Sequence, residues 1–387
     1  MEPNNNVPPE ILESQKYFDL SFYYIFIESL NTSKWKILHT IKLSVYPLLV
    51  LFNGICMVHN LIYLDIFKNQ IKLFHLLVYL GTTYQFEWKY FYLLLSGREI
   101  ENIKEFMKHL QQSLLVHNLV SNIRKQQLPI ALKFSNYFVR IFFTSTAASG
   151  VVLITSNIYR TNFTSPLMYT IPFMSENVWY YRPFNVVFQT ISVTVFVFGV
   201  IGSDFILTIT VGFLNGELRS IIKLISKLDS SKIAENSSNE ILRNLYVMHV
   251  RVYSILNNLR RIYWTLSIHI LLSNFLFICF TLYLTRFLSF SVGTIFTLMN
   301  VLLQLIFICY NSQILLDKTE AVADALWQTS WYDLKLKDQW TFLLILKVSQ
   351  MQKGISVCGL SNISVNTLVQ VLKSALTYGA FLYTIIN

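Results

Sequence analysis

Charged residues are scarce in this sequence. Asp, Glu, Lys and Arg make up 13% of its 387 residues, while hydrophobic residues make up 53%. A soluble globular protein carries about a quarter charged residues, so this composition excludes a water-soluble protein of this length. The apolar chain is long enough for several membrane crossings, and the composition therefore predicts a polytopic membrane protein.

Motifs for catalysis and metal binding are also missing. The sequence contains no Gly-rich phosphate loop, no HExxH and no CxxC pair, and its seven histidines are scattered. Three of the four cysteines (Cys56, Cys279 and Cys309) lie in apolar segments, so no disulfide framework is implied. The net charge of +10 does not indicate nucleic acid, because the basic residues are spread between apolar segments rather than clustered with aromatics. We therefore predict no enzyme activity, no cofactor, no metal site and no nucleic-acid partner.

Apolar segments of the length that spans a bilayer, about 20 residues, recur along the chain. They cover residues 43–64, 73–95, 134–159, 183–213, 262–285, 288–316 and 361–386. The sequence therefore predicts an all-α membrane protein with seven transmembrane helices.

The distribution of Lys and Arg predicts the orientation of these helices. Most of the 31 basic residues fall in the N-terminal segment and in the second-to-third, fourth-to-fifth and sixth-to-seventh connections. Because positive residues favour the cytosol, we expect a cytosolic N-terminus and an extracellular C-terminus. A G-protein-coupled receptor would have the opposite orientation. The outer connection 160–182 contains a glycosylation sequon at Asn162, but further sequons in predicted cytosolic segments weaken that signal.

The inner connections predict a cytosolic domain. Residues 218–228 and 241–264 place apolar residues at helical spacing with basic residues between them, and 340–353 is apolar but too short to span. We expect these extensions to pack into a bundle below the bilayer. The predicted division is as follows: 1–36, a cytosolic segment with an interfacial helix at 16–30; 37–213, transmembrane helices 1–4; 214–261, a cytosolic helical anchor; 262–316, transmembrane helices 5 and 6; 317–360, a cytosolic connection with an anchor helix; and 361–387, helix 7.

Charged residues inside the predicted spans are costly in hydrocarbon. Glu87 and Lys89 lie in the second span, Arg140 in the third and Asp204 in the fourth. Because buried charges usually persist as pairs, we expect Arg140 to pair with Asp204 or Glu87 as a structural contact. An ion relay or transport site is the alternative.

The last predicted helix has a polar stripe. At spacings of three and four its residues are Asn366, Gln370, Lys373 or Ser374, Thr377, Phe381 and Thr384. Such a stripe suits a helix that lines a water-filled path with Phe381 as a dewetting constriction, although packing against neighbouring helices explains it equally well. One helix cannot enclose a pore, so the first interpretation requires several subunits around an axis.

Three features of the chain resemble the insect odorant receptors, and the resemblance extends over essentially its whole length. Trp-Tyr-Asp-Leu occurs at 331–334, Lys373 precedes the pair Thr377 and Tyr378, and Asp204 lies on the inner half of the fourth span. The Gln-Phe ending of the related gustatory receptors is missing, which favours the odorant branch. The connection 214–261 lacks the long insertion of the shared co-receptor, so the chain resembles a ligand-tuning subunit.

The resemblance implies an odorant-gated, non-selective cation channel. It would be a heterotetramer that combines tuning subunits with co-receptor subunits and conducts monovalent and divalent cations. Its expected place is among the lipids of the plasma membrane of a sensory neuron dendrite. A gustatory receptor channel is the first alternative, and a G-protein-coupled receptor and a transporter are less favoured.

The resemblance also implies a ligand pocket and a gate. A small volatile odorant would bind in the outer half of the bundle, at positions that fall on Tyr79, Thr83, Ser149, Phe188, Ser192, Phe196, Phe296 and Asn300. The pore would be lined by Gln370, Ser374, Thr377, Phe381 and Ile385. The family's gate is usually Val or Leu, and its position falls here on Phe381.

Overall fold

The computed structural model describes residues 7–25, 36–63, 70–161, 169–172, 174, 177–230, 235–287, 292–351 and 353–386. Within these ranges the chain is almost entirely helical, which confirms the all-α prediction. The helices are α1 (Pro9–Ile25), α2 (Lys36–Ile62), α3 (Gln70–Leu95), α4 (Gly97–Leu114), α5 (Leu119–Thr161), α6 (Tyr181–Ser230), α7 (Glu235–Phe287), α8 (Val292–Trp327), the 3-10 turn η1 (Trp331–Asp333), α9 (Leu336–Ser349) and α10 (Val365–Ile386). Two short strands, β1 (Ser356–Val357) and β2 (Ser361–Asn362), pair antiparallel just before α10.

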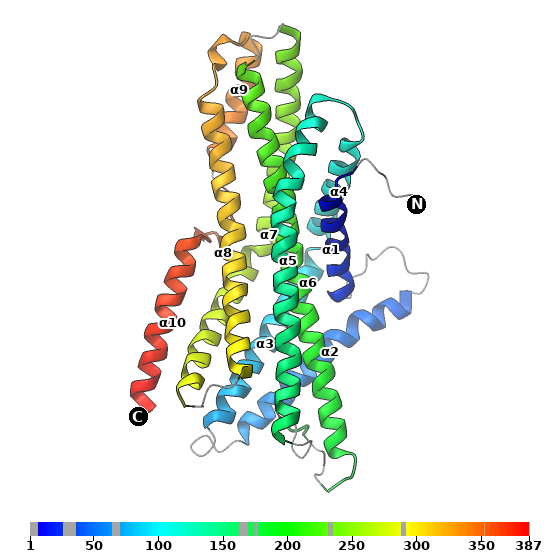
Figure 1. Ribbon diagram of the computed structural model, residues 1–387, viewed down its shortest axis with the longest axis vertical. Coiled ribbons are helices and arrows are strands. Elements are labelled where there is room, and N and C mark those ends of the chain that lie inside the picture. Colours follow the sequence, from blue (N-terminus) through cyan, green and yellow to red (C-terminus); the bar gives the residue numbers. More distant parts are fainter. Residues whose placement is uncertain are drawn as a thin grey trace.

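Each predicted span coincides with one helix over most of its described residues, and several of these helices continue well beyond the predicted span. The first residues of the last span, Ser361 and Asn362, form β2 instead. α6 has 50 residues and α7 has 53, whereas about 20 residues cross the hydrocarbon core of a bilayer. Figure 1 shows α5 to α8 running together along the long axis of the molecule, with α9 at the end far from the start of α6. The excess length therefore forms a helical extension outside the predicted membrane region.

Hydropathy alone selects fewer of these helices. Among the described residues, three segments combine the length and the apolar composition needed to cross a membrane: Tyr181–Leu228, Asn239–Leu282 and Leu298–Trp327. Pro47–Ile62 is a shorter apolar helix. The helix α3 carries Glu87 and Lys89 in its C-terminal half, and such residues lower the mean hydropathy of a span.

The helix α6 lies at the centre of the bundle. Every residue from 201 to 218 is buried, and α6 packs against α1, α2, α3, α5, α7 and α8. Small side chains permit this density of packing. A Cβ atom on Gly216 would lie 2.7 Å from a side-chain carbon of Leu128 on α5, so glycine allows the two backbones to approach closely.

The first helix is part of the bundle. α1 begins earlier in the chain than the predicted interfacial helix, and it packs against α5 and α6. Its Ile11 and Phe18 side chains are buried, and the Ser14 hydroxyl donates to Asn136 Oδ1 on α5 at 2.7 Å. Residues 26–30 of the predicted helix lie outside the described residues.

The helix α4 was not predicted from the sequence. Its buried residues recur at helical spacing and form one apolar stripe: Ile100, Ile103, Phe106, Met107, Leu110 and Leu114. This stripe packs against α5 and α7. A stripe this narrow is what a short amphipathic helix needs to join a larger bundle.

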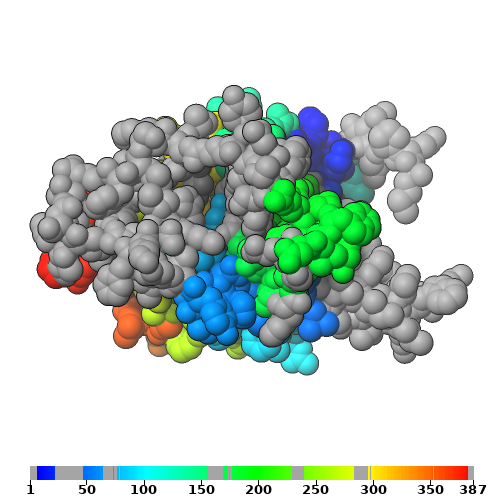
Figure 2. All heavy atoms as spheres, turned by 90° about the horizontal axis from the view of Figure 1, so that it is seen from below, coloured from blue at the N-terminus to red at the C-terminus, as the bar shows by residue number. Residues whose placement is uncertain are grey.

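The last helix stands at the side of the bundle. α10 contacts α7 and α8 and is drawn in red at the edge of the molecule (Figure 1). In the view from below, the red residues again lie at one edge, while the green residues around the start of α6 lie on the other half of the same end (Figure 2). α10 is therefore peripheral within a single chain.

Candidate functional site

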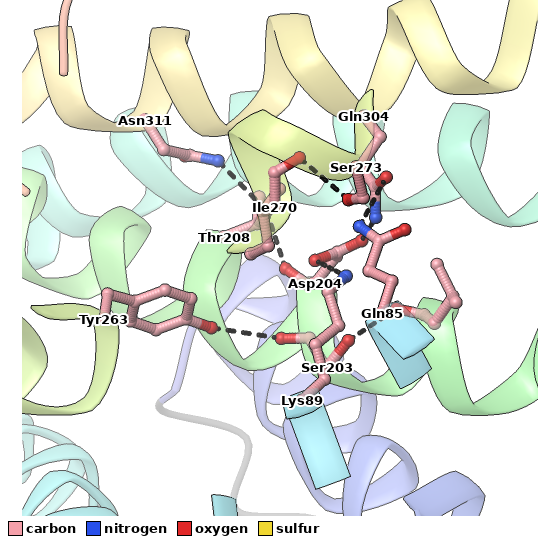
Figure 3. Close-up of polar contacts among 11 residues, drawn as sticks. Gln85, Lys89, Ser203, Asp204, Thr208, Tyr263, Ile270, Ser273, Gln304 and Asn311 are labelled. Carbon is pink, nitrogen blue, oxygen red and sulfur yellow. Dashed lines mark hydrogen bonds and ion pairs between the residues drawn. The ribbon is translucent and has the colours of Figure 1, made fainter. Parts of the chain in front are cut away.

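A buried polar network lies within the bundle, and its centre is Asp204 on α6. Lys89 Nζ of α3 donates to Asp204 Oδ1 at 2.7 Å, and Gln304 Nε2 of α8 donates to Asp204 Oδ2 at 2.9 Å. Gln85 Nε2, one turn before Lys89, donates to Gln304 Oε1 at 3.0 Å. Figure 3 shows these side chains converging on Asp204. We call these four residues the inner network, and it joins α3, α6 and α8.

Neighbouring hydroxyl and amide groups extend the inner network. Thr208 Oγ1 donates to the backbone carbonyl of Asp204 at 3.0 Å and accepts from Asn311 Nδ2 of α8 at 3.2 Å. The hydroxyl of Tyr263, on α7, donates to the carbonyl of Ser203 at 3.3 Å (Figure 3). The network therefore involves residues of α3, α6, α7 and α8.

The predicted pairing of Arg140 with Asp204 or Glu87 is wrong. Arg140 is exposed on α5 and pairs with Glu13 of α1, with Nε at 2.9 Å from Glu13 Oε1. The partner of Asp204 is Lys89, because that side chain of α3 points into the bundle while Arg140 points outward. Glu87 has a buried Oε1 atom without a hydrogen bond to any residue in the described ranges. The rotation of each helix about its own axis decides which charged side chains meet, and the sequence alone does not specify that rotation.

Three of the predicted ligand residues, Tyr79, Thr83 and Phe188, lie at a second core cluster. This outer cluster consists of Cys56, Met57, Leu76, Tyr169 and Ile171, and it is separate from the main core. Tyr79 and Phe188 pack against it. The Thr83 hydroxyl is buried, donates to the Tyr79 carbonyl at 2.9 Å and lies 3.8 Å from the sulfur of Met57.

The other predicted ligand residues are placed differently. Ser192 is buried on α6, and its hydroxyl donates to the Phe188 carbonyl at 2.9 Å. Phe196 belongs to the main core, where its ring meets Phe86 edge to face at 6.0 Å. Most of this group is therefore already engaged in helix packing or in hydrogen bonds within a helix.

Asn300 is the centre of a third group, at the contact of α5 and α8. Its Oδ1 accepts from Ser145 Oγ at 3.0 Å and from Thr146 Oγ1 at 3.3 Å. Its Nδ2 donates to the Phe296 carbonyl at 2.9 Å, and the Ser149 hydroxyl donates to the Thr146 carbonyl at 3.0 Å. Asn300 thus ties α8 to α5 in the structure.

Sequence reasoning missed the residues that hold the connection between α5 and α6. Asn60 of α2 accepts from Thr170 N at 3.0 Å and donates to the Thr170 carbonyl at 2.6 Å. Asn185 Oδ1 accepts from Ile171 N at 3.1 Å, and Gln189 Nε2 donates to the Tyr169 carbonyl at 2.6 Å. The sequence pattern that could have identified these residues is an amide side chain inside an apolar span, where it needs a hydrogen-bond partner.

The predicted stripe of α10 faces away from the chain's own bundle. Gln370, Ser374 and Thr377 are exposed, and Phe381 is 56% exposed. On the other side of the helix Ala375 is fully buried, and the residues that pack with it against the main core are Leu368, Val371 and Leu372. The helix therefore presents a polar face that its own chain does not cover. Ile385 lies on the same helix.

One further predicted site residue is not described by the structure. Asn162, the predicted glycosylation site, lies outside the described residues. Among the residues that are described, no group of three or more His, Cys, Asp and Glu side chains could hold a metal ion.

Long apolar helices with a buried charge network are typical of a polytopic helical membrane protein. The family model "7tm Odorant receptor" matches residues 70–376, which is most of the chain. The chain belongs to the odorant receptor family. It is therefore an odorant-sensing receptor channel rather than an enzyme.

Solved structures show the same fold. The insect olfactory receptor OR5 from Machilis hrabei in complex with eugenol matches with a TM-score of 0.77 and 13% identity, over 97% of this chain and 100% of that chain. The structure of OR5 from Machilis hrabei described without that ligand matches with a TM-score of 0.78 and 12% identity over the same shares. A comparison with curated protein sequences finds no match.

Proposed function

We propose that this chain is the odorant-tuning subunit of a ligand-gated, non-selective cation channel. It assembles with co-receptor subunits into a tetramer in the plasma membrane of a sensory neuron dendrite, with its N-terminus in the cytosol. A small volatile molecule binds in the outer half of the bundle. Binding opens a central pore that α10 lines, through which monovalent and divalent cations pass.

The exposed polar face of α10 is the observation that carries this proposal. Gln370, Ser374 and Thr377 project away from the bundle, whereas Ala375 on the opposite side is buried. A transmembrane helix with a polar face toward lipid is unfavourable. Several copies of this face around one axis would enclose a polar path instead. Phe381, further along the same face, would narrow the path as a hydrophobic constriction.

The ligand region rests on the outer cluster and its neighbours. Tyr79, Thr83, Phe188 and Ser192 lie on or beside this cluster, on α3 and α6. Aromatic and apolar side chains around a few hydroxyl groups are the usual lining of a small-molecule site. We place the odorant here, with affinity that comes mainly from apolar burial.

Contacts between α10 and its neighbours would couple the ligand to the pore. The Phe275 ring of α7 meets Tyr378 edge to face at 5.7 Å, and Cys279 Sγ lies 3.6 Å from the Ala375 carbonyl. Gln313 of α8 accepts from the backbone amide of Val365 at 3.2 Å. A ligand that favours one arrangement of α3, α6 and α8 would thereby shift α7, α8 and α10.

Whole-cell current measurement tests the proposal. Cells express this chain with an insect co-receptor, this chain alone or the co-receptor alone, and each receives volatile esters, alcohols, aldehydes and terpenes. We expect fast cation current that requires both subunits. Current from this chain alone would replace the tuning subunit by a homomeric channel, and no current in any combination would contradict the channel function.

A further inference from the structure

The hydroxyl of Tyr169 is the least explained polar group near the outer cluster. The side chain is 1% exposed, and its hydroxyl makes no hydrogen bond to any residue that the structure describes. Buried hydroxyl groups normally have a partner. The ring itself packs in the outer cluster, beside Cys56, Met57 and Leu76.

Buried amide side chains hold the backbone around Tyr169. Gln189 holds its carbonyl, Asn60 holds both backbone groups of Thr170, and Asn185 holds the amide of Ile171. These three amide side chains are buried and come from α2 and α6. The backbone of 169–171 is therefore held by side chains of both α2 and α6.

Polar groups near the hydroxyl are already engaged or are few. The Ser192 hydroxyl is close enough to interact with that of Tyr169, but it donates to the Phe188 carbonyl at 2.9 Å and forms no hydrogen bond of regular geometry with the Tyr169 hydroxyl. Met57, Leu76 and Ile171 supply apolar surface. A buried water needs two to four polar partners, and this lining offers few of them.

We propose that the Tyr169 hydroxyl donates the hydrogen bond that orients the ligand. The ligand would be an aldehyde, ketone or ester, with its hydrocarbon part against the outer cluster and against Tyr79 and Phe188. A carbonyl oxygen only accepts, so it satisfies the phenol O–H and adds no donor of its own. An alcohol brings a second O–H that this lining leaves unpaired. This inference rests on the proposed function, since it assigns the chemistry of the odorant site.

The variant Tyr169→Phe tests the proposal because it removes only the hydroxyl. The probes are 2-heptanone, heptanal, hexyl acetate, 1-heptanol and heptane. Binding is read from the ligand-induced rise in the thermal unfolding midpoint of the purified full chain in detergent. Gating is read separately as the concentration for half-maximal current with the co-receptor. Tyr180→Phe is the matched control, because Tyr180 lies in the same connection and is exposed.

We expect Tyr169→Phe to weaken binding of the carbonyl probes by about threefold to tenfold, which corresponds to the loss of one hydrogen bond. Heptane binding stays unchanged, and so do all responses of Tyr180→Phe. Without ligand, the variant unfolds at the same or a higher temperature, because it has lost a buried hydroxyl that had no partner. A purely structural role predicts the opposite, a lower midpoint.

Each other result has a defined meaning. Equal weakening of heptane and 2-heptanone, or unchanged binding of all carbonyl probes, would overturn the proposal. So would a wild-type chain that binds no carbonyl probe, or one that binds 1-heptanol as tightly and with the same dependence on Tyr169. Binding that depends on Tyr169 without any current would uphold this inference and contradict the channel function.

Discussion

At the scale of residues, the pair of Lys89 and Asp204 shows how this chain keeps charge inside the bundle. The two side chains are 2% and 8% exposed. Each carboxylate oxygen of Asp204 has a partner, Lys89 on one side and Gln304 on the other. An unpaired charge in this position would be far less stable than the pair. The inner network therefore links α3, α6 and α8. Moving one of these helices away would leave Asp204 without one of its partners.

Replacing one partner of this pair should destabilise the protein strongly. We expect Asp204→Asn or Lys89→Met to reduce the free energy of unfolding by about 3–5 kcal/mol, because the other charge stays buried and unpaired. The double variant Lys89→Met/Asp204→Leu should recover most of this loss. Thermal unfolding midpoints in detergent measure all three. Arg140→Gln is the control, since Arg140 is exposed, and it should change little. Single variants as stable as the wild type would show that the charges are not buried together.

A buried histidine outside the predicted spans gives the stability of the anchor region a dependence on pH. His249 is 2% exposed, and its ring lies 4.3 Å from that of Tyr253. Burial, together with the smaller effect of the positive charge of Lys353, lowers the pKa of His249 to about 4. In the unfolded chain histidine has a pKa of about 6.5. The unfolded state therefore binds the proton first, and stability is lost as the pH falls from about 6.5 toward 4.

The variant His249→Gln should be less sensitive to acid. Relative to pH 7, wild type should lose up to about 3 kcal/mol more stability than the variant as the pH approaches 4. The measurement is the unfolding midpoint of both proteins across this range, in the same detergent. Superimposable pH profiles would mean that His249 is not held neutral by burial.

At the scale of elements, one glycine decides how closely α3 and α6 approach. A Cβ atom added to Gly199 would lie 1.8 Å from Cε2 of Phe86. Phe86 is itself buried and contacts Phe196. No side chain larger than hydrogen fits at position 199 unless the ring moves. Along α3 and α6 this contact lies between the outer cluster and the inner network. It therefore sets the distance between these two helices.

Gly199→Ala should destabilise the protein by about 1–3 kcal/mol, the usual penalty for overpacking. The double variant Gly199→Ala/Phe86→Leu should recover part of the loss, because leucine leaves room for the new methyl group. Gly97→Ala is the matched control, since a Cβ atom there meets nothing within 4 Å. Unfolding midpoints provide the comparison. Equal midpoints for Gly199→Ala and Gly97→Ala would show that α3 and α6 are not in close contact at this position.

At the scale of the whole molecule, the arrangement of α10 indicates that one chain is only part of the functional unit. The helix touches its own chain along one side, through α7 and α8, and it leaves Gln370, Ser374 and Thr377 exposed on another. Apolar residues on the exposed side include Leu376, Tyr378 and Phe381. A surface that mixes large apolar and small polar side chains suits contact with other subunits around a shared axis.

The variant Phe381→Ala should weaken the closed state of the channel. If Phe381 forms the constriction, a smaller side chain widens it and lets water enter. We expect larger current in the absence of odorant, altered sensitivity to pore blockers, or both, in cells that also express the co-receptor. Leu376→Ala is the control, because Leu376 is similarly exposed on the same helix but lies off the polar stripe. Unchanged leak and blocker sensitivity in Phe381→Ala would exclude it as the gate.

Much of the fold could be predicted from the sequence because hydropathy and helical spacing are local properties. Each apolar segment from 43–64 to 361–386 coincides with a helix over most of its described residues, and Gln370, Ser374, Thr377 and Phe381 of the predicted α10 stripe are exposed. The helix α4 was missed, since an amphipathic helix of 18 residues has a weaker signal than an apolar span. The outer connection was missed as well, because Tyr169 is buried by contacts with distant parts of the chain.

The sequence by itself determined that this is a helical membrane protein, since apolar length and the shortage of charge leave few other solutions in lipid. It also contained the residues that place the chain in its family. Only the tertiary structure decided which charges meet. Arg140 and Lys89 are both basic residues in predicted spans, but the rotation of α3 and α5 about their axes turns Lys89 toward Asp204 and Arg140 toward Glu13. That rotation depends on the packing of all the neighbouring helices together, and no local pattern in the sequence specifies it.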